Sequence, residues 1–147
     1  MQAPHIVEQP APLAVEDRPP ARILIVEDDA SIAEVLSVRL KRQGFETTIA
    51  LNGRDALAAA TTDFPDLILM DLRLPDIDGL TICDQLGDSP DTAVIPVIVL
   101  SGMERPDIIR RSRAAGCQFF VRKPYDPNAL LILIQHALDE TSQWRVK

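Results

Sequence analysis

The sequence predicts an α/β protein built around one parallel sheet. From Arg22 onward, short apolar runs typical of strands alternate five times with segments that have the spacing of amphipathic helices. The connections are short, and right-handed crossovers between parallel strands place helices on both faces of such a sheet. The common arrangement of five such strands is the doubly wound, flavodoxin-like order 2-1-3-4-5, and this is the order that we expect.

The first half of the predicted domain contains two strands and two helices. Residues 22–27 form the first strand, in which one arginine precedes four apolar residues. Residues 30–43 follow as a helix, because apolar residues recur on one helical face and a glycine comes directly after it. Residues 45–50 form a strand whose threonines indicate an exposed sheet edge. Asn52 is then the N-cap of an alanine-rich helix at 53–62.

The second half begins with the most apolar strand. Residues 67–71 form a continuous apolar run that ends in an acid, which suits a strand buried on both faces. A helix at 79–86 and a strand at 97–100 follow. The helix at 106–115 begins with proline in its first turn and ends at a glycine. The last two elements are a strand at 119–121 and a helix at 127–140.

Composition limits the kind of protein that this chain can be. Its 147 residues carry a net charge of −7, which argues against nucleic-acid binding because such domains normally have a basic surface. We see no apolar run near the ~20 residues that span a bilayer and no signal-peptide pattern, so we expect a cytoplasmic protein without membrane contact. Cys83 and Cys117 fit neither a disulfide framework nor a metal-ligand spacing, and we interpret them as buried thiols.

The chain divides into one domain and two tails. Residues 1–21 contain five prolines and have no helical or strand period, so we expect a flexible N-terminal tail. The domain covers residues 22–140. Residues 141–147 are expected to be a short C-terminal tail, too small for an output domain, which predicts a stand-alone domain.

Polar side chains follow four of the five predicted strands. They are Glu27, Asp28, Asp29, Asp71, Ser101 and Lys123. Each one alone could be a helix cap, a turn residue or a surface charge, but the carboxyl ends of parallel strands share one edge of the sheet. Clustered carboxylates repel one another and demand a cation, and oxygen ligands without histidine or cysteine suit Mg²⁺. Such a site fits phosphoryl transfer to a carboxylate.

Four segments carry a recognisable pattern around these side chains. They are residues 26–29 (Val-Glu-Asp-Asp), 70–79 (Met-Asp-Leu-Arg-Leu-Pro-Asp-Ile-Asp-Gly), 99–102 (Val-Leu-Ser-Gly) and 120–125 (Phe-Val-Arg-Lys-Pro-Tyr). In residue type and spacing, the chain from about residue 22 to residue 140 resembles the response-regulator receiver domains of two-component signalling, the CheY-like family.

The resemblance implies roles for the acidic residues. Asp71 would accept a phosphoryl group from a sensor histidine kinase or a histidine phosphotransfer protein. Glu27, Asp28, Asp71 and the backbone carbonyl of Arg73 would hold Mg²⁺. Asp29 is one acid more than the motif needs, and we interpret it as the N-cap of the first helix.

The resemblance also implies a switch and a control of phosphoryl lifetime. Ser101 and Lys123 would contact the phosphoryl group, and Phe120 would turn inward when the hydroxyl moves, unless Phe120 is simply a core residue. In the family pattern, the positions of Arg73 and Met103 flank the route of the water molecule that attacks the phosphorylated aspartate. Neither offers a carboxylate or an amide to orient that water, so we expect slow autodephosphorylation.

Partner binding is expected on the face formed by the helix at 106–115, the strand at 119–121 and the helix at 127–140. Candidate contact residues on this face are Arg105, Arg110, Arg111, Arg113 and Tyr125. The basic cluster would suit an acidic partner or a second copy, although it is also consistent with a solvated helix face. Residues 130–134 (Leu-Leu-Ile-Leu-Ile) are apolar around more of the helix than the single stripe that would pack on the sheet. We therefore expect this helix to bind a partner or to form a homodimer.

Two other functions remain open from the sequence alone. One is a phosphorylation-independent adaptor of the same fold, in which the acids only cap helices. The other is a Mg²⁺-dependent phosphatase of the haloacid-dehalogenase kind, but that family needs an aspartate two residues after its nucleophile, and this chain has Arg73 there. We therefore expect no enzymatic activity beyond Mg²⁺-dependent self-phosphorylation and autodephosphorylation.

Overall fold

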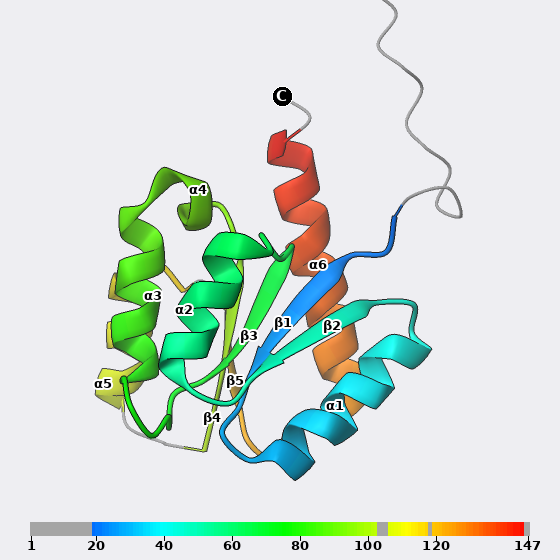
Figure 1. Ribbon diagram of the computed structural model, residues 1–147, viewed down its shortest axis with the longest axis horizontal. Helices are drawn as coiled ribbons and strands as arrows, with labels where there is room; N and C mark the ends of the chain where they lie inside the picture. The colour runs from blue at the N-terminus through cyan, green and yellow to red at the C-terminus, as the bar shows by residue number, and fades with distance from the viewer. Residues whose placement is uncertain (1–18, 103–105, 118, 146–147) are drawn as a thin grey trace, which may run out of the picture.

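A parallel sheet organises the structure. The computed structural model describes residues 19–102, 106–117 and 119–145. In this part of the chain the sheet is five-stranded, with order β2-β1-β3-β4-β5 (Figure 1). Its strands are β1 (Arg22–Val26), β2 (Glu46–Ala50), β3 (Leu67–Asp71), β4 (Val97–Ser101) and β5 (Phe119–Arg122). The predicted fold class and strand order are confirmed.

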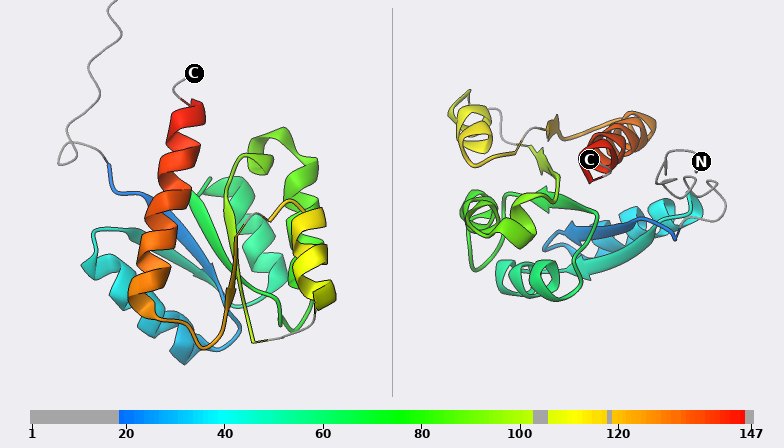
Figure 2. Two further views of the ribbon diagram at one scale, coloured as in Figure 1. Left: turned by 180° about the vertical axis from the view of Figure 1, so that it is seen from behind. Right: turned by 90° about the horizontal axis from the view of Figure 1, so that it is seen from above.

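Helices cover both faces of this sheet. They are α1 (Ala30–Arg42), α2 (Gly53–Thr62), α3 (Gly79–Asp88), α4 (Pro90–Ala93), α5 (Pro106–Ala114) and α6 (Pro127–Arg145). Helices α1 and α6 pack on one face, and α2, α3 and α5 pack on the other (Figures 1 and 2). Along β1, Ile23 and Ile25 contact the α1–α6 core, whereas Leu24 and Val26 contact the other core. This double burial explains why the central strands are apolar without alternation.

The edge strand β2 behaves as its threonines predict. Among the strands that the structure describes, it pairs only with β1, and its exposed and half-buried residues alternate up to the buried Ala50. Thr47 faces α1, where its hydroxyl forms a 2.6 Å hydrogen bond with the hydroxyl of Ser37. The threonines therefore combine strand propensity with an anchor for the helix that follows β1.

Two elements differ from the sequence prediction. The short helix α4 was not predicted; the hydroxyl of Thr92 in it donates to the carbonyl of Leu86 at 2.6 Å and fastens this turn to α3. The last helix continues to Arg145, so residues 141–145 belong to α6 rather than to a separate tail. No glycine or proline interrupts residues 140–145, so the sequence there gives no stop signal. The predicted N-terminal tail lies almost wholly outside the described residues.

Within the described ranges, none of the helices has both the length and the mean hydropathy that a bilayer crossing requires.

Candidate functional site

The strand register brings the predicted acids to one edge of the sheet. Val26 at the end of β1 pairs with Met70, directly before Asp71, and Asp71 pairs with Leu100 of β4. Glu27 and Asp71 are buried, with exposed fractions of 6% and 8%, whereas Asp28 is exposed. Glu27, Asp28 and Asp71 each offer a carboxylate oxygen, and these atoms all lie within 4.8 Å of one another.

Lys123 reaches this acidic cluster from the loop after β5. Its Nζ donates to Oδ2 of Asp71 at 3.0 Å and to Oε2 of Glu27 at 3.1 Å. The Lys123 backbone N–H donates to the carbonyl of Ser101 at 2.9 Å, so the end of β4 holds the loop that carries the ammonium. One ammonium thus bridges two buried carboxylates, while the site contains three acids.

The pKa shifts reflect this crowding of charge. The pKa of Glu27 is raised to about 6, first because burial penalises its charged form and second because Asp71 lies beside it. Burial alone would lower the pKa of the Lys123 ammonium, but Asp71 and Glu27 outweigh burial and raise it. The site therefore holds more negative charge than its own lysine neutralises easily.

Backbone groups fix the two buried carboxylates. The N–H of Arg73 donates to Oδ1 of Asp71 at 2.9 Å, and the N–H of Asp29 donates to Oε1 of Glu27 at 3.2 Å. Gly79, at the start of α3, lies so close to the end of β3 that a Cβ there would be 2.9 Å from the Asp71 carbonyl oxygen. The Asp71 carboxylate is therefore held by an N–H of its own loop, and the Asp71 backbone packs closely against α3.

The predicted N-caps next to the site are confirmed. The Asp29 carboxylate accepts the N–H groups of Ser31 and Ile32 at 2.9 and 3.2 Å, as expected for the start of α1. Asn52 accepts the N–H of Asp55 at 2.8 Å and caps α2. The Asp29 carboxylate thus caps the helix, and the three acids that could together hold a metal ion are Glu27, Asp28 and Asp71.

Two of the predicted switch residues lie on the strands β4 and β5, and their switch role stays a prediction. Ser101 is buried at the end of β4, with an exposed fraction of 2%. Phe120 is half-buried on β5 and packs against the core formed with α2, α3 and α5. Met103 lies outside the described residues, so the lifetime prediction for Arg73 and Met103 stays a prediction. The side chain of Arg73 is exposed.

The predicted partner residues lie on two different faces. Arg110, Arg111 and Arg113 are exposed on α5, and Arg111 pairs with Asp78 at 3.3 Å. Tyr125 instead packs with the α1–α6 core and lines a cavity together with residues of α1. Arg105 lies outside the described residues.

The apolar run in α6 is largely accounted for within one molecule. Leu130 and Ile134 are buried against the sheet, and Leu131 and Leu133 are partly buried, whereas Ile132 is 72% exposed. The run therefore supports self-association less strongly than its sequence indicated.

Sequence reasoning gave no role to Asp76 and Asp78. The Asp78 carboxylate accepts the N–H of Leu80 at 3.1 Å and caps α3, and an acid directly before a helical segment could have revealed this role. Asp76 accepts N–H groups from the start of α2. No local sequence signal indicates that contact, because its partners are distant in the chain.

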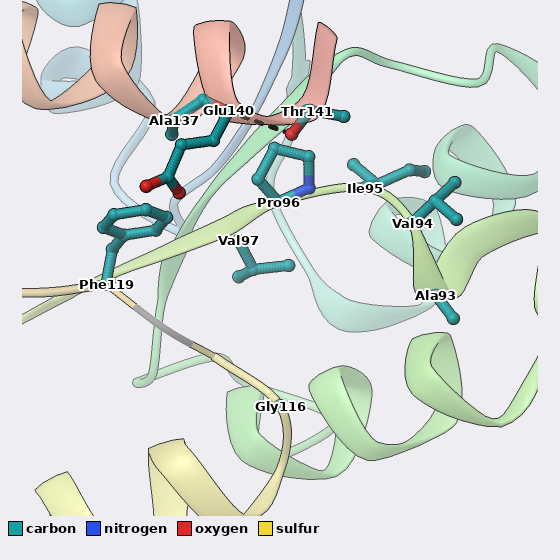
Figure 3. A pocket seen from close by; sticks show the side chains of 10 residues that line it. All are labelled: Ala93, Val94, Ile95, Pro96, Val97, Gly116, Phe119, Ala137, Glu140 and Thr141. Carbon is teal, nitrogen blue, oxygen red and sulfur yellow. Dashed lines mark hydrogen bonds between the residues drawn. The ribbon is translucent and has the colours of Figure 1, made fainter. Parts of the chain in front are cut away.

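A cavity of about 390 Å³ lies at the opposite edge of the sheet, beside the amino ends of β4 and β5 (Figure 3). Its lining is mainly apolar, and Glu140 and Thr141 of α6 contribute polar atoms at one side (Figure 3). The cavity does not include any of the predicted site residues. The chemistry expected from the sequence therefore belongs to the carboxyl edge.

Comparison with known proteins identifies the family. Residues 23–135 match the family model for the response regulator receiver domain. The response regulator PleD of Caulobacter vibrioides is 38% identical over 107 residues, which cover 72% of this chain and 23% of PleD. The DNA-binding dual master transcriptional regulator RpaA of Synechocystis sp. is 33% identical over 122 residues, which cover 83% of this chain and 51% of RpaA. This chain thus spans about half or less of these relatives.

The fold comparison gives the same result. The crystal structure of a CheY-like response regulator receiver domain protein from Methanospirillum hungatei JF-1 matches with a TM-score of 0.80 and 30% identity, covering 84% of this chain and 98% of that one. The chain therefore belongs to the response regulator receiver domain family of two-component signal transduction. Its three clustered carboxylates are typical of the Mg²⁺ site of receivers, and a site of oxygen donors only fits that hard cation.

Proposed function

We propose that this receiver takes a phosphoryl group onto Asp71 from a phosphohistidine of a sensor kinase or phosphotransfer protein, and that the modification changes which partner it binds. The observation that carries this proposal is the buried Asp71 carboxylate, bridged to Glu27 by Lys123 and with a carboxylate oxygen of Asp28 within 4.8 Å. Receiver domains partner histidine kinases, and family membership supports a donor of this kind.

The residues divide the work of the transfer. A carboxylate oxygen of Asp71 attacks the phosphorus, the P–N bond breaks, and its electron pair returns to the donor imidazole. Asp71 is held for this attack by the Arg73 N–H at 2.9 Å. Mg²⁺ held by Glu27, Asp28, Asp71 and the Arg73 carbonyl would neutralise charge on the phosphoryl oxygens. Lys123, already 3.0 Å from the acceptor, stabilises the negative charge of the product.

The switch uses groups that border the acceptor. Phosphorylation adds charge and acceptor oxygens at Asp71, which draw the Lys123 ammonium and the Ser101 hydroxyl inward. The 2.9 Å bond from the Lys123 backbone to the Ser101 carbonyl supports joint movement of their two loops. Phe120 follows as the neighbouring aromatic residue. The β5 edge of the sheet, where α5 covers one face and α6 the other, reports the change to a downstream protein. We place this protein in the cytoplasm, where sensor kinases present their phosphohistidine.

Intact mass spectrometry tests the proposal. The protein is incubated with acetyl phosphate with and without Mg²⁺, and the wild type is compared with Asp71→Asn. We expect one phosphoryl group on the wild type only with Mg²⁺, and none on Asp71→Asn. Asp28→Asn is the matched control, because it keeps the acceptor and removes one proposed metal ligand; it should need a higher Mg²⁺ concentration. A folded wild type that gains no phosphoryl group would contradict the proposal and favour the adaptor function.

A further inference from the structure

Asp76 fastens the loop after the phosphoacceptor to a helix that is distant in sequence. It lies between β3 and α3, and its Oδ1 accepts the N–H of Gly53 at 2.7 Å and that of Ile77 at 2.9 Å. Its Oδ2 accepts the N–H of Arg54 at 3.0 Å. Gly53 and Arg54 are the first residues of α2. One exposed carboxylate therefore connects the acceptor loop to the amino end of another element.

This contact suits a charged carboxylate. The first N–H groups of a helix have no partner within the helix, and the helix dipole favours negative charge there. The pKa of Asp76 is lowered, first by the N–H of Gly53 and second by that of Arg54. The local cap of α2, Asn52, binds a different N–H, that of Asp55. Two side chains thus accept the N–H groups of the first turn of α2: Asp76 from a loop distant in sequence, and Asn52 from the position directly before the helix.

Close packing joins the same two segments. A Cβ on Gly53 would lie 2.8 Å from Cδ1 of Ile82, 2.9 Å from Cβ of Ile77 and 3.1 Å from Oδ1 of Asp76. Only a residue without a side chain allows α2 to approach the loop and α3 this closely. The bridge is therefore built from a carboxylate on one side and a glycine on the other.

The strand that precedes α2 contacts the backbone of the acidic pair. Ala50 ends β2 just before α2, and its carbonyl accepts the N–H of Glu27 at 3.1 Å. On the other side of the bridge, the acceptor loop begins with the bond from the Arg73 N–H to Asp71. The segment from Ala50 to Arg54 therefore bonds to the acidic pair through the end of β2 and to the acceptor loop through the start of α2.

We propose that Asp76 is a positioning residue for the metal site: by bridging α2 and the acceptor loop, it fixes Asp71 and the Arg73 carbonyl relative to Glu27 and Asp28. Asp76 acts without touching the ion or the phosphoryl group. The inference rests on the proposed function, since it assumes that these groups hold Mg²⁺. Groups that orient metal ligands in this way affect metal affinity strongly.

Mg²⁺ titration followed by NMR tests this role on the unphosphorylated full chain. We expect Asp76→Ala to raise the Mg²⁺ dissociation constant about tenfold, the lower end of the range for residues that orient metal ligands. Asp76→Asn keeps one acceptor oxygen and the side-chain size, so it should raise the Mg²⁺ dissociation constant less. This variant can be used for the test if the alanine variant does not fold. Phosphorylation by acetyl phosphate at saturating Mg²⁺ should approach the wild-type rate, because the loss is in ion binding.

Asn52→Ala is the matched control, because it removes the local cap of the same helix and leaves the bridge in place. We expect it to lower the melting temperature without changing the Mg²⁺ dissociation constant. The proposal would be overturned if the Mg²⁺ dissociation constant were unchanged in both Asp76→Ala and Asp76→Asn, or if it rose equally in Asn52→Ala. Asp76 would then only cap α2. A wild type that binds Mg²⁺ but is not phosphorylated would overturn the proposed function alone, and the titration would still decide the role of Asp76.

Discussion

Glu27 shows how the site sets the stability of the metal-free protein. Its pKa is raised to about 6 from 4.5 by burial and by Asp71, so the folded state favours the protonated carboxyl. Between these two pKa values the folded chain binds a proton that the unfolded chain has lost, and stability falls as pH rises. The contribution of the protonated carboxyl is complete below pH 4.5 and is lost as pH passes 6.

Glu27→Gln should remove this pH dependence. Urea unfolding in EDTA at several pH values gives the free energy of unfolding of both proteins. We expect the stability of the wild type relative to Glu27→Gln to fall by on the order of 1 to 2 kcal/mol between pH 4.5 and pH 7, since one pKa unit corresponds to about 1.4 kcal/mol and the unfolded carboxyl is already half-ionised at pH 4.5. A difference between the two proteins that stays constant across this range would contradict the raised pKa.

Among the elements, α3 depends most directly on a small residue beside the site. A Cβ on Gly79 would meet backbone atoms, the carbonyl oxygen of Asp71 and Cα of Leu72, each at 2.9 Å. Backbone cannot move aside as a flexible side chain can. The close approach of α3 to β3 is therefore part of how the Asp71 backbone is held.

Gly79→Ala should destabilise the fold by about 2 kcal/mol, in the range for overpacking of a well-packed core. Gly87→Ala in the same helix is the control, because a Cβ there would meet only the Ala115 carbonyl oxygen at 3.9 Å. Alanine is the better helix former, so the control should be neutral or stabilising by up to about 1 kcal/mol. Denaturant unfolding of the two variants measures the difference, and equal free energies of unfolding would count against the steric argument.

Elements and strand ends could be predicted because their signals are local. An apolar run that ends in Asp71 indicates a buried strand with an acid at its end, even when the neighbouring strands and helices are unknown. The bridge from Asp76 to α2 has no such signal, since it depends on how two elements distant in sequence approach each other. The position of Tyr125 on the α1 side, opposite the arginines of α5, depends on packing that the residue pattern does not contain.

At the level of the whole molecule, the two cores separate the surfaces available to partners. The arginines of α5 belong to the face with α2 and α3, whereas the exposed Ile132 belongs to α6 on the other face. Two partners of different chemistry could therefore bind at separate places. We propose that an acidic partner would bind at the arginines of α5 and that a second copy would bind around the exposed Ile132 of α6.

Self-association through α6 is testable by light scattering. We expect a monomer without modification and a dimer after loading with beryllofluoride, a phosphoryl analogue. Ile132→Glu should keep the loaded protein monomeric, because the change places charge at a side chain that is 72% exposed. Arg113→Glu on α5 is the control and should leave the dimer intact. A loaded wild type that stays monomeric at high concentration would contradict self-association.

The bridge from Lys123 to Glu27 joins residues that are 96 positions apart in the chain. During synthesis the acids of β1 and β3 emerge well before the strand that delivers their ammonium. Loop closure over such a distance is slow compared with local helix formation. The contacts of Lys123 with Glu27 and Asp71 can therefore form only after β5 has docked beside β4, so the complete site is a late product of folding.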